Sequence, residues 1–247
     1  MSQVFIVGLS ELPRQVKVAR DEVLDWVFVV LSGMASDCRA IRAAETLPFG
    51  ECCPHGIGSS LPKTKRSGAA LPCADGISIP LTIDIDGPGA TVNIAALYLC
   101  DGDDKIEFDF TIRHNAGGSV SRQLVNGIVG GKAQVSFHGL IYVRQDAQAT
   151  KAHQENHNIL ISESARVETT PQLEIYADDV EYSHGATTGF LNADELFYMR
   201  SRGIPEAEAR KMQMISFLAP VLDRITDPAE RRRIRRMVEK AVGKMAG

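Results

Sequence analysis

Four cysteine and histidine side chains in the first third of the chain could bind a metal. Cys52, Cys53, His55 and Cys73 offer enough thiolate and imidazole ligands for zinc or an iron–sulfur cluster. Their spacing lacks a C-x-x-C pair, and the segment around them is rich in glycine, proline and serine. We therefore interpret them as free side chains of a loop, and metal binding by this group stays an open alternative.

Three further histidines could also act as ligands. A neutral imidazole such as that of His184 can bind iron, but one ligand cannot hold a cluster, so its co-ligands would come from another chain. The alternative is a turn histidine that bonds to the backbone. His153 and His157 have helical spacing, but the polar run at residues 156–158 indicates a loop entering a strand, which argues against a shared metal.

Asp178 and Asp179 are the carboxylate pair that could do acid–base chemistry. Adjacent residues of a strand point to opposite faces, so the two carboxylates would not share one substrate. Capping, solvation or an interface contact is the favoured interpretation. The sequence contains no G-x-x-x-x-G-K-[ST] loop, so we expect no nucleotide to bind this chain by that route.

Length and charge limit the classes of protein to consider. A chain of 247 residues with 44% hydrophobic content can bury a large core in one domain, with or without appendages. Its net charge of -4 gives no reason to expect nucleic acid or an anionic membrane as partner. The apolar stretch at residues 26–31 is too short for a span, and the first residues do not resemble a secretory signal. Five cysteines, an odd number, fit reduced thiols, so we expect a cytoplasmic protein.

Short strand signals dominate the chain from Pro80 to about His184. Alternating apolar residues occur at 106–112 and 135–143, with turn-forming glycines between such segments. This pattern predicts an all-β body, and periodicity alone leaves a sandwich and a β-solenoid both open. Residues 1–45 fit neither period clearly, and the Gly- and Pro-rich residues 49–76 form the best internal boundary.

Helical periodicity begins after Gly189. Asn192 and Glu195 form a capping-box pattern, and Gly203 suits the position after a short helix. Pro205 and Pro228 then open two further helices. The first of these carries an apolar stripe wide enough to be covered on two sides, which predicts an interface. The arginine run at 231–236 lies near glutamates and indicates a solvated or partner-facing helix.

Several segments of the β body and of its helical junction resemble one known family. They are residues 137–143 (Phe-His-Gly-Leu-Ile-Tyr-Val), 158–162 (Asn-Ile-Leu-Ile-Ser), 172–180 (Gln-Leu-Glu-Ile-Tyr-Ala-Asp-Asp-Val), 183–189 (Ser-His-Gly-Ala-Thr-Thr-Gly) and 196–204 (Leu-Phe-Tyr-Met-Arg-Ser-Arg-Gly-Ile). Their order and spacing are similar to the SufB/SufD family of iron–sulfur cluster assembly scaffolds over about residues 80–225. SufD members often carry a cysteine where this chain has Tyr182, and SufB members place a cysteine and a glutamate near Gly185. The chain is therefore closer to SufD.

The resemblance implies a right-handed parallel β-helix with C-terminal helices. We accordingly divide the chain into an N-terminal region of uncertain structure (1–79), a β-helix core (80–189) and a helical region (190–247). The implied function is a non-catalytic scaffold subunit that pairs with a SufB-type subunit, docks a SufC-type ATPase and shares a transient cluster with its partner. A homodimer of isolated chains is compatible with this role, and neither nucleic acid nor membrane is an expected partner.

Two sets of residues are implied as contact sites. The expected interface with the sister subunit contains Asp178, Asp179, Tyr182 and His184, with His184 as the candidate cluster ligand. The expected interface with the ATPase contains Phe197, Tyr198, Arg200, Arg202, Met214 and Phe217.

The rival hypothesis is a carbohydrate-active enzyme or binding protein, because β-solenoids also host that chemistry. Such a protein needs aromatic platforms and clustered carboxylates or calcium ligands. Aromatic residues make up only 6% of this chain, with one Trp. Co-purification of an ATPase and a homologous β-helix subunit from native cells would separate the two hypotheses.

Overall fold

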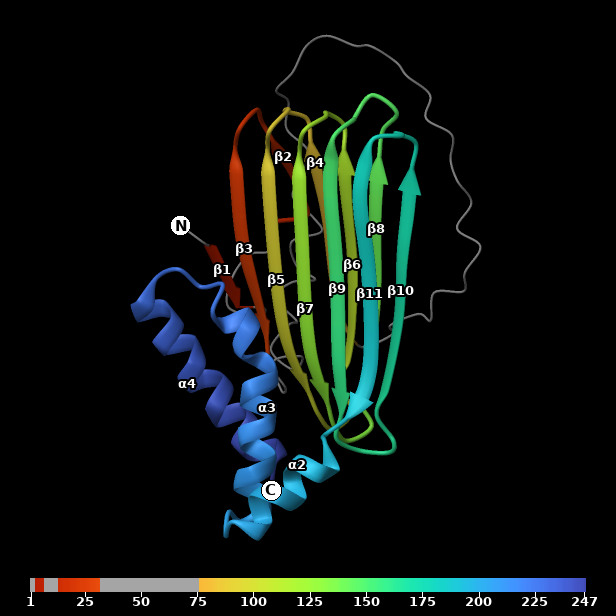
Figure 1. Ribbon diagram of the computed structural model, residues 1–247. Coiled ribbons are helices and arrows are strands. Elements are labelled where there is room, and N and C mark those ends of the chain that lie inside the picture. Colours follow the sequence, from red (N-terminus) through yellow and green to blue (C-terminus); the bar gives the residue numbers. More distant parts are fainter. Residues whose placement is uncertain (1–2, 7–12, 32–75) are drawn as a thin grey trace, which may run out of the picture.

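The computed structural model describes residues 3–6, 13–31 and 76–247, which form two parallel sheets and three helices (Figure 1). The strands are β1 (Gln3–Ile6), β2 (Gln15–Val18), β3 (Val23–Val30), β4 (Ile77–Ile85), β5 (Thr91–Cys100), β6 (Lys105–His114), β7 (Val120–Val129), β8 (Gln134–Val143), β9 (Thr150–Leu160), β10 (Arg166–Ile175) and β11 (Val180–Phe190). The helices are α2 (Ala193–Ser201), α3 (Glu206–Leu222) and α4 (Pro228–Met245).

Successive strands alternate between the two sheets. One sheet has the order β1-β3-β5-β7-β9-β11 and the other the order β10-β8-β6-β4-β2, and the paired strands run parallel. Each turn of the chain therefore stacks on the previous one, as in the pairing of Phe108 with Phe137. The predicted parallel β-helix is confirmed, and the antiparallel sandwich that periodicity had left open is excluded for these strands.

Alternate residues of each strand face the space between the sheets and fill it. The ring of Phe110 lies 5.9 Å from that of Phe28 and 5.8 Å from that of Phe137, so aromatic side chains stack from coil to coil. Tyr98 is fully buried, and a Cβ atom at Gly127 would lie 1.9 Å from its ring. Glycine is therefore required at position 127 by the close approach of this ring.

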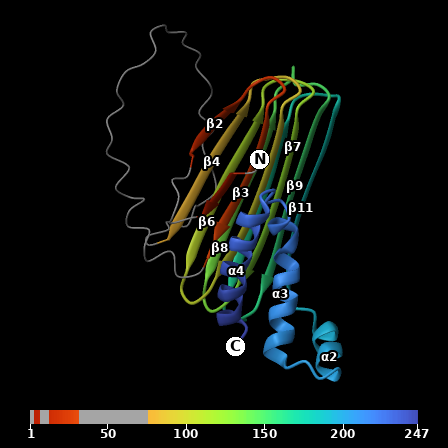
Figure 2. The same cartoon turned by 90° about the vertical axis from the view of Figure 1, so that its left-hand side faces the viewer.

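Helices α3 and α4 share one apolar cluster with the outer face of the sheet that contains β5 and β7. Asn192 caps α2 by accepting from the backbone N–H groups of Asp194 and Glu195, as the capping-box pattern predicts. Pro205 precedes the first residue of α3, and Pro228 is the first residue of α4. Figure 2 shows α4, α3 and α2 side by side, with α3 in contact with both others.

The apolar face of α3 is buried by the rest of this chain. Met214, Leu218 and Val221 pack with Leu97 of β5 and with the apolar residues of α4. The side-chain amide of Asn126 in β7 donates a 2.8 Å hydrogen bond to the backbone oxygen of Phe217 and fixes the helix on the sheet. The stripe is covered on two sides, as predicted, but the sheet and α4 cover it.

Polar residues at buried positions of the β-helix make one strand, β9, difficult to recognise from its sequence. Residues 156–158 were interpreted as a loop, which is wrong, because they lie within β9 and two of their side chains are buried. The inward positions of β9 include Gln154, Asn156 and Asn158, so the strand lacks apolar alternation.

The region before residue 80 contributes strands where it is described. β1, β2 and β3 extend the same two sheets, and β4 begins at Ile77. The proposed boundary at residue 79 stays a prediction. Among the described residues, no helix combines the length and apolar character needed to cross a bilayer.

Candidate partner-binding surfaces

The last coil leaves one end of the β-helix open. β11 pairs with β9 over its full length, and β10 pairs with β8, but both are the terminal strands of their sheets among the described residues. Figure 1 shows them at the opposite side of the solenoid from β3. The outer edge of β11 therefore presents backbone N–H and C=O groups that can pair with another strand.

The sister-subunit residues predicted from sequence lie on or beside this edge. Tyr182 and His184 occupy alternate positions of β11, so both project from the same side of the strand. Their register partners are Ala152 and Gln154, whose side chains are buried between the sheets. Because no further coil in the described part of the chain covers β11, Tyr182 is 51% exposed and His184 is exposed.

Asp178 and Asp179 lie in the loop between β10 and β11, so the argument from strand alternation does not apply to them. The backbone N–H of Asp179 donates to Oε1 of Gln148 at 2.9 Å, and its carbonyl oxygen accepts from the N–H of Ala149 at 2.6 Å. The backbone of this loop is fixed, while both aspartates are exposed. They add negative charge beside the open edge.

The interior behind His184 is polar. Nε2 of Gln154 donates to Oε1 of Gln123 at 3.2 Å, and Nδ2 of Asn158 donates to Oδ1 of Asn156 at 2.6 Å. The hydroxyl of Tyr98 donates to Asn158. Burial raises the pKa of Tyr98 well above its usual range, and the nearby Cys100 adds to this shift. The tyrosine is therefore a neutral donor, and the last coils bury amides where earlier coils bury aromatic rings.

Within the described part of the chain, no three histidine, cysteine or carboxylate side chains lie close enough to hold a metal ion. Further ligands for His184 are accordingly not found there. Cys52, Cys53, His55 and Cys73 lie outside the described residues.

His153 and His157 lie on the outer face of β9, each with a partner on β11. Nδ1 of His153 is 2.8 Å from Oγ of Ser183, and Nδ1 of His157 is 2.8 Å from Oγ1 of Thr187. Four strand residues separate the two histidines by about 13 Å, so they cannot share one metal ion.

The second surface is α2, which has no buried residue. Phe197 is 74% exposed and Tyr198 is 59% exposed. The guanidinium of Arg202 lies 5.3 Å from the centroid of the Tyr198 ring, and Arg200 pairs with Glu206 at 3.3 Å. These four predicted ATPase-contact residues therefore form one accessible aromatic and basic surface.

Two other predicted ATPase contacts do not belong to that surface. Met214 has no exposed area, because its side chain faces the sheet, and its assignment as a contact residue is wrong. Phe217 is partly buried and packs against the same apolar cluster. The apolar stripe is visible in the sequence, but only the three-dimensional arrangement shows that the sheet and α4 already cover it.

A groove beside α2 adds two residues that sequence analysis missed. It has a volume of about 460 Å³ and is lined in part by Phe190, Met199, Met212 and Phe217. Phe190 is 68% exposed and Met212 is 47% exposed. Met212 and Met214 are both apolar residues of α3, but they lie on different sides of the helix. The orientation of α3 on the sheet therefore buries Met214 and exposes Met212.

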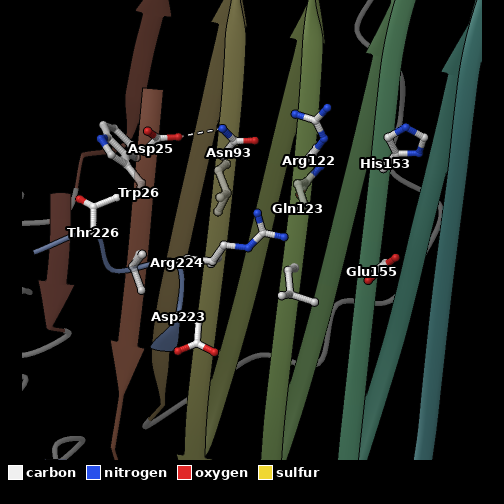
Figure 3. Close-up of a pocket in the computed structure, with 14 residues that line it drawn as sticks. Asp25, Trp26, Asn93, Arg122, Gln123, His153, Glu155, Asp223, Arg224 and Thr226 are labelled. Carbon is white, nitrogen blue, oxygen red and sulfur yellow. Dashed lines mark hydrogen bonds between the residues drawn. The ribbon is translucent and has the colours of Figure 1, made fainter. Parts of the chain in front are cut away.

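A third surface lies on the outer face of the first sheet, next to the turn between α3 and α4. Figure 3 shows Asp25, Asn93, Arg122 and His153 in a row across four neighbouring strands, with Arg224 below them. The groove has a volume of about 530 Å³. Asn93 donates to Asp25 at 2.7 Å. Side chains of both signs line the groove, and it marks the edge of the helix-covered face.

Comparison with known proteins identifies one family. Residues 78–217 match the family described as "SUF system FeS cluster assembly, SufBD core domain". The chain is 39% identical to the iron–sulfur cluster assembly protein SufD of Escherichia coli over 143 residues. This matched region covers 58% of this chain and 34% of that protein. It is 40% identical over 143 residues to a SufBD family protein of Synechocystis, covering 58% of this chain and 32% of the relative.

SufD of Bacillus subtilis is 29% identical over 161 residues, covering 65% of this chain and 37% of the relative. The chain thus spans about a third of the length of these curated relatives. The family match covers more than half of the chain, from β4 to the middle of α3. The chain therefore belongs to the SufBD core family of the SUF system.

Proposed function

We propose that this chain is a non-catalytic scaffold subunit of a cytoplasmic SUF complex for iron–sulfur cluster assembly. In this role β11 pairs with a SufB-type subunit, and the α2 surface docks a SufC-type ATPase. The observation that carries the proposal is the exposed 11-residue edge of β11, which lies inside the family match. Relatives named SufD support the assembly system to which the chain is assigned.

An exposed edge of this length is suited to a strand of a partner. Its backbone groups can extend the sheet, and Tyr182 adds an aromatic side chain of the kind enriched at protein interfaces. In an isolated chain the same edge could pair with a second copy.

The cluster itself is cargo that this chain shares with its sister subunit. His184 offers one imidazole at the open edge, and the co-ligands would be side chains of the partner. We expect little cluster on the isolated chain for this reason. The alternative of a carbohydrate-active protein rested on architecture alone, and the SufBD match now accounts for that architecture.

The cluster role is tested by His184→Asn in the complex purified without oxygen. Asparagine keeps one hydrogen bond but is a poor ligand for iron. We expect normal assembly of the complex and normal ATPase activity, with a large loss of the iron and sulfide recovered. His153→Asn, on the neighbouring strand, is the matched control and should keep normal iron. Normal iron in the His184 variant would remove that residue from the mechanism.

ATPase docking is tested by comparing two equally exposed tyrosines. Tyr198, on α2, is 59% exposed, and Tyr176, in the loop before β11, is 58% exposed. We expect Tyr198→Ser to weaken ATPase binding about tenfold or more, since exposed aromatic residues are common binding hot spots. Tyr176→Ser should leave the dissociation constant unchanged. Equal effects of both changes, or none from Tyr198→Ser, would contradict docking at α2.

A further inference from the structure

Helix α4 has a positive net charge in a chain that is acidic as a whole. The helix contains seven Lys and Arg residues and two Glu residues, which gives it a formal charge of +5. Because the whole chain carries -4, the residues outside α4 carry -9. A helix of 18 residues thus has the opposite sign to the rest of the molecule.

The seven basic residues of α4 fall into two groups that differ in their partners. Arg231 pairs with Asp223 at 3.8 Å, Arg233 pairs with Glu230, and Arg235 pairs with Glu239 at 3.0 Å. A second group has no ion pair with any residue that the structure describes, and all its members are exposed: Arg232, Arg236, Lys240 and Lys244. We call this second group the α4 stripe.

The α4 stripe follows the repeat of the helix. Its residues are four positions apart, so they form one row about 18 Å long with a cation roughly every 6 Å. The row lies roughly 160° around the helix from the buried apolar residues, such as Ile234 and Val238. It therefore points away from the body of the protein.

Helix stability does not explain this arrangement. Like charges four residues apart destabilise a helix, and the stripe contains three such pairs in succession. The helix dipole favours Lys244 in the last turn but disfavours Arg232 near the N-terminus. A function outside the chain is the simpler explanation for keeping the row.

A protein with a compact acidic surface is the partner that best fits the stripe. The apolar residues of α4 are already buried, so the helix cannot insert them into a membrane. A long polyanion such as nucleic acid would extend past the stripe to a body that carries -9. Carboxylates on successive turns of a partner helix repeat every 6 Å and match the row.

The α4 stripe and the proposed ATPase site lie on two helices that both contact α3. α3 contacts both α2 and α4, and Figure 2 shows the three helices in one row. A partner that covers this row would meet the aromatic surface of α2 and the cations of α4.

We propose that the α4 stripe is an electrostatic docking surface for an acidic face of the ATPase subunit, a step that rests on the proposed function. Attraction between such surfaces increases the association rate and depends on salt, while contacts such as Tyr198 determine how long the complex lasts.

The test is the association rate of this chain with the SufC-type ATPase of the same organism at several salt concentrations. The double variant Arg232→Gln and Arg236→Gln removes two stripe charges and keeps good helix formers. We expect about a tenfold slower association at low salt, a weaker salt dependence and an almost unchanged dissociation rate.

The matched control is Arg233→Gln with Arg235→Gln. It changes the net charge by the same amount on the same helix, but it removes the arginines that already have glutamate partners. We expect less than about a twofold change in association rate, with both variants checked by thermal unfolding.

Three results would overturn the inference. Equal slowing by both double variants would mean that only net charge matters. An unchanged rate for the stripe variant, while Tyr198→Ser still weakens binding, would remove the stripe and leave α2 docking intact. Tight binding of a labelled oligonucleotide at physiological salt, lost in the stripe variant alone while ATPase association is unaffected, would assign the stripe to nucleic acid. If the wild-type chain does not bind the ATPase, both the stripe and the α2 proposal fail.

Discussion

The closed coils of the β-helix, strands β3 to β8, differ from the last coil, β10 and β11, in what their side chains face. Ile141 in β8 is fully buried, whereas Ile175, on the same side of β10, is partly exposed. Both coils follow the same register and the same backbone pairing. The last coil differs because no further strand among the described residues covers it, so side chains at inward positions are accessible to a partner.

The same contrast separates the two sides of α3. Met214 is fully buried against the sheet, while Met212 is 47% exposed in the groove beside α2. We therefore expect partner binding where one side of a helix or strand is not packed against the rest of its own chain. Matched pairs of buried and exposed residues should then differ in their effect on stability.

The largest expected effect is that of Met214→Asp. The change places a carboxylate in an apolar cluster without a partner, so we expect a loss of about 4 kcal/mol or more in the free energy of unfolding. Met212→Asp should change it by less than about 0.5 kcal/mol. Urea denaturation followed by circular dichroism measures both values. A mild effect of Met214→Asp would mean that α3 separates easily from the sheet and could still offer this residue to a partner.

The two isoleucines give the next contrast. Ile141→Ala should lower the free energy of unfolding by about 4 kcal/mol, because paired strands on both sides, β6 and β10, hold the cavity open. Ile175→Ala should lower it by about 1 kcal/mol, because solvent already reaches that side chain. Denaturant midpoints of the two variants provide the test. If the losses are equal in the isolated chain, the last coil is covered in solution.

The sequence predicted the closed coils better than the open end. Apolar alternation at residues 106–112 and 135–143 identified β6 and β8, and both strands bury that pattern. β9 could not be predicted in full, because its inward Gln154 and Asn156 bond to other polar side chains instead of forming an apolar face. Hydrophobic periodicity detects a strand only when its buried face is apolar.

The sequence predicted a contact face around His184 only through a family resemblance, and that interface stays a prediction. The structure adds that His184 lies on a strand at the end of its sheet among the described residues. Met214 was assigned to the wrong surface because a helical stripe gives no information on which neighbour covers it. The α4 charges were visible in the sequence, but the ion pairs that separate Arg233 from Arg232 required three-dimensional positions.

Buried His114 makes the stability of the closed coils depend on pH. Its ring nitrogens lie 2.7 Å from Oγ of Ser119 and 2.8 Å from Oγ of Ser121, and burial lowers its pKa to about 4. The pKa of His114 is lower in the folded state than in the unfolded state, so the fold favours the neutral imidazole. The contribution of neutral His114 to the free energy of unfolding is complete above about pH 6.5 and is lost as the pH falls through about 4. The shift corresponds to roughly 3 kcal/mol.

This pH dependence can be isolated by comparison with His114→Gln. Between pH 7 and pH 4 we expect the wild-type chain to lose roughly 3 kcal/mol more unfolding free energy than the variant, since acidic groups common to both proteins cancel. Denaturant titrations at each pH provide the values. Parallel curves for the two proteins would show that His114 is solvated or charged in the folded chain.

The smallest expected effect on stability, and the sharpest test of the open edge, is that of Tyr182→Lys. Tyr182 is 51% exposed on β11, so the change should alter the free energy of unfolding by no more than about 0.5 kcal/mol. A lysine on an edge strand opposes pairing with another strand, because its charge would be buried in the extended sheet. We therefore expect the dissociation constant for the SufB-type subunit to rise about tenfold or more, measured by light scattering of the mixed chains. Val23→Lys is the control, because Val23 is 62% exposed on β3, which lies in the same sheet but far from its β11 edge. If Tyr182→Lys binds the SufB-type subunit as tightly as the wild type, then β11 is exposed without being an interface, and exposure in the last coil has no connection with assembly.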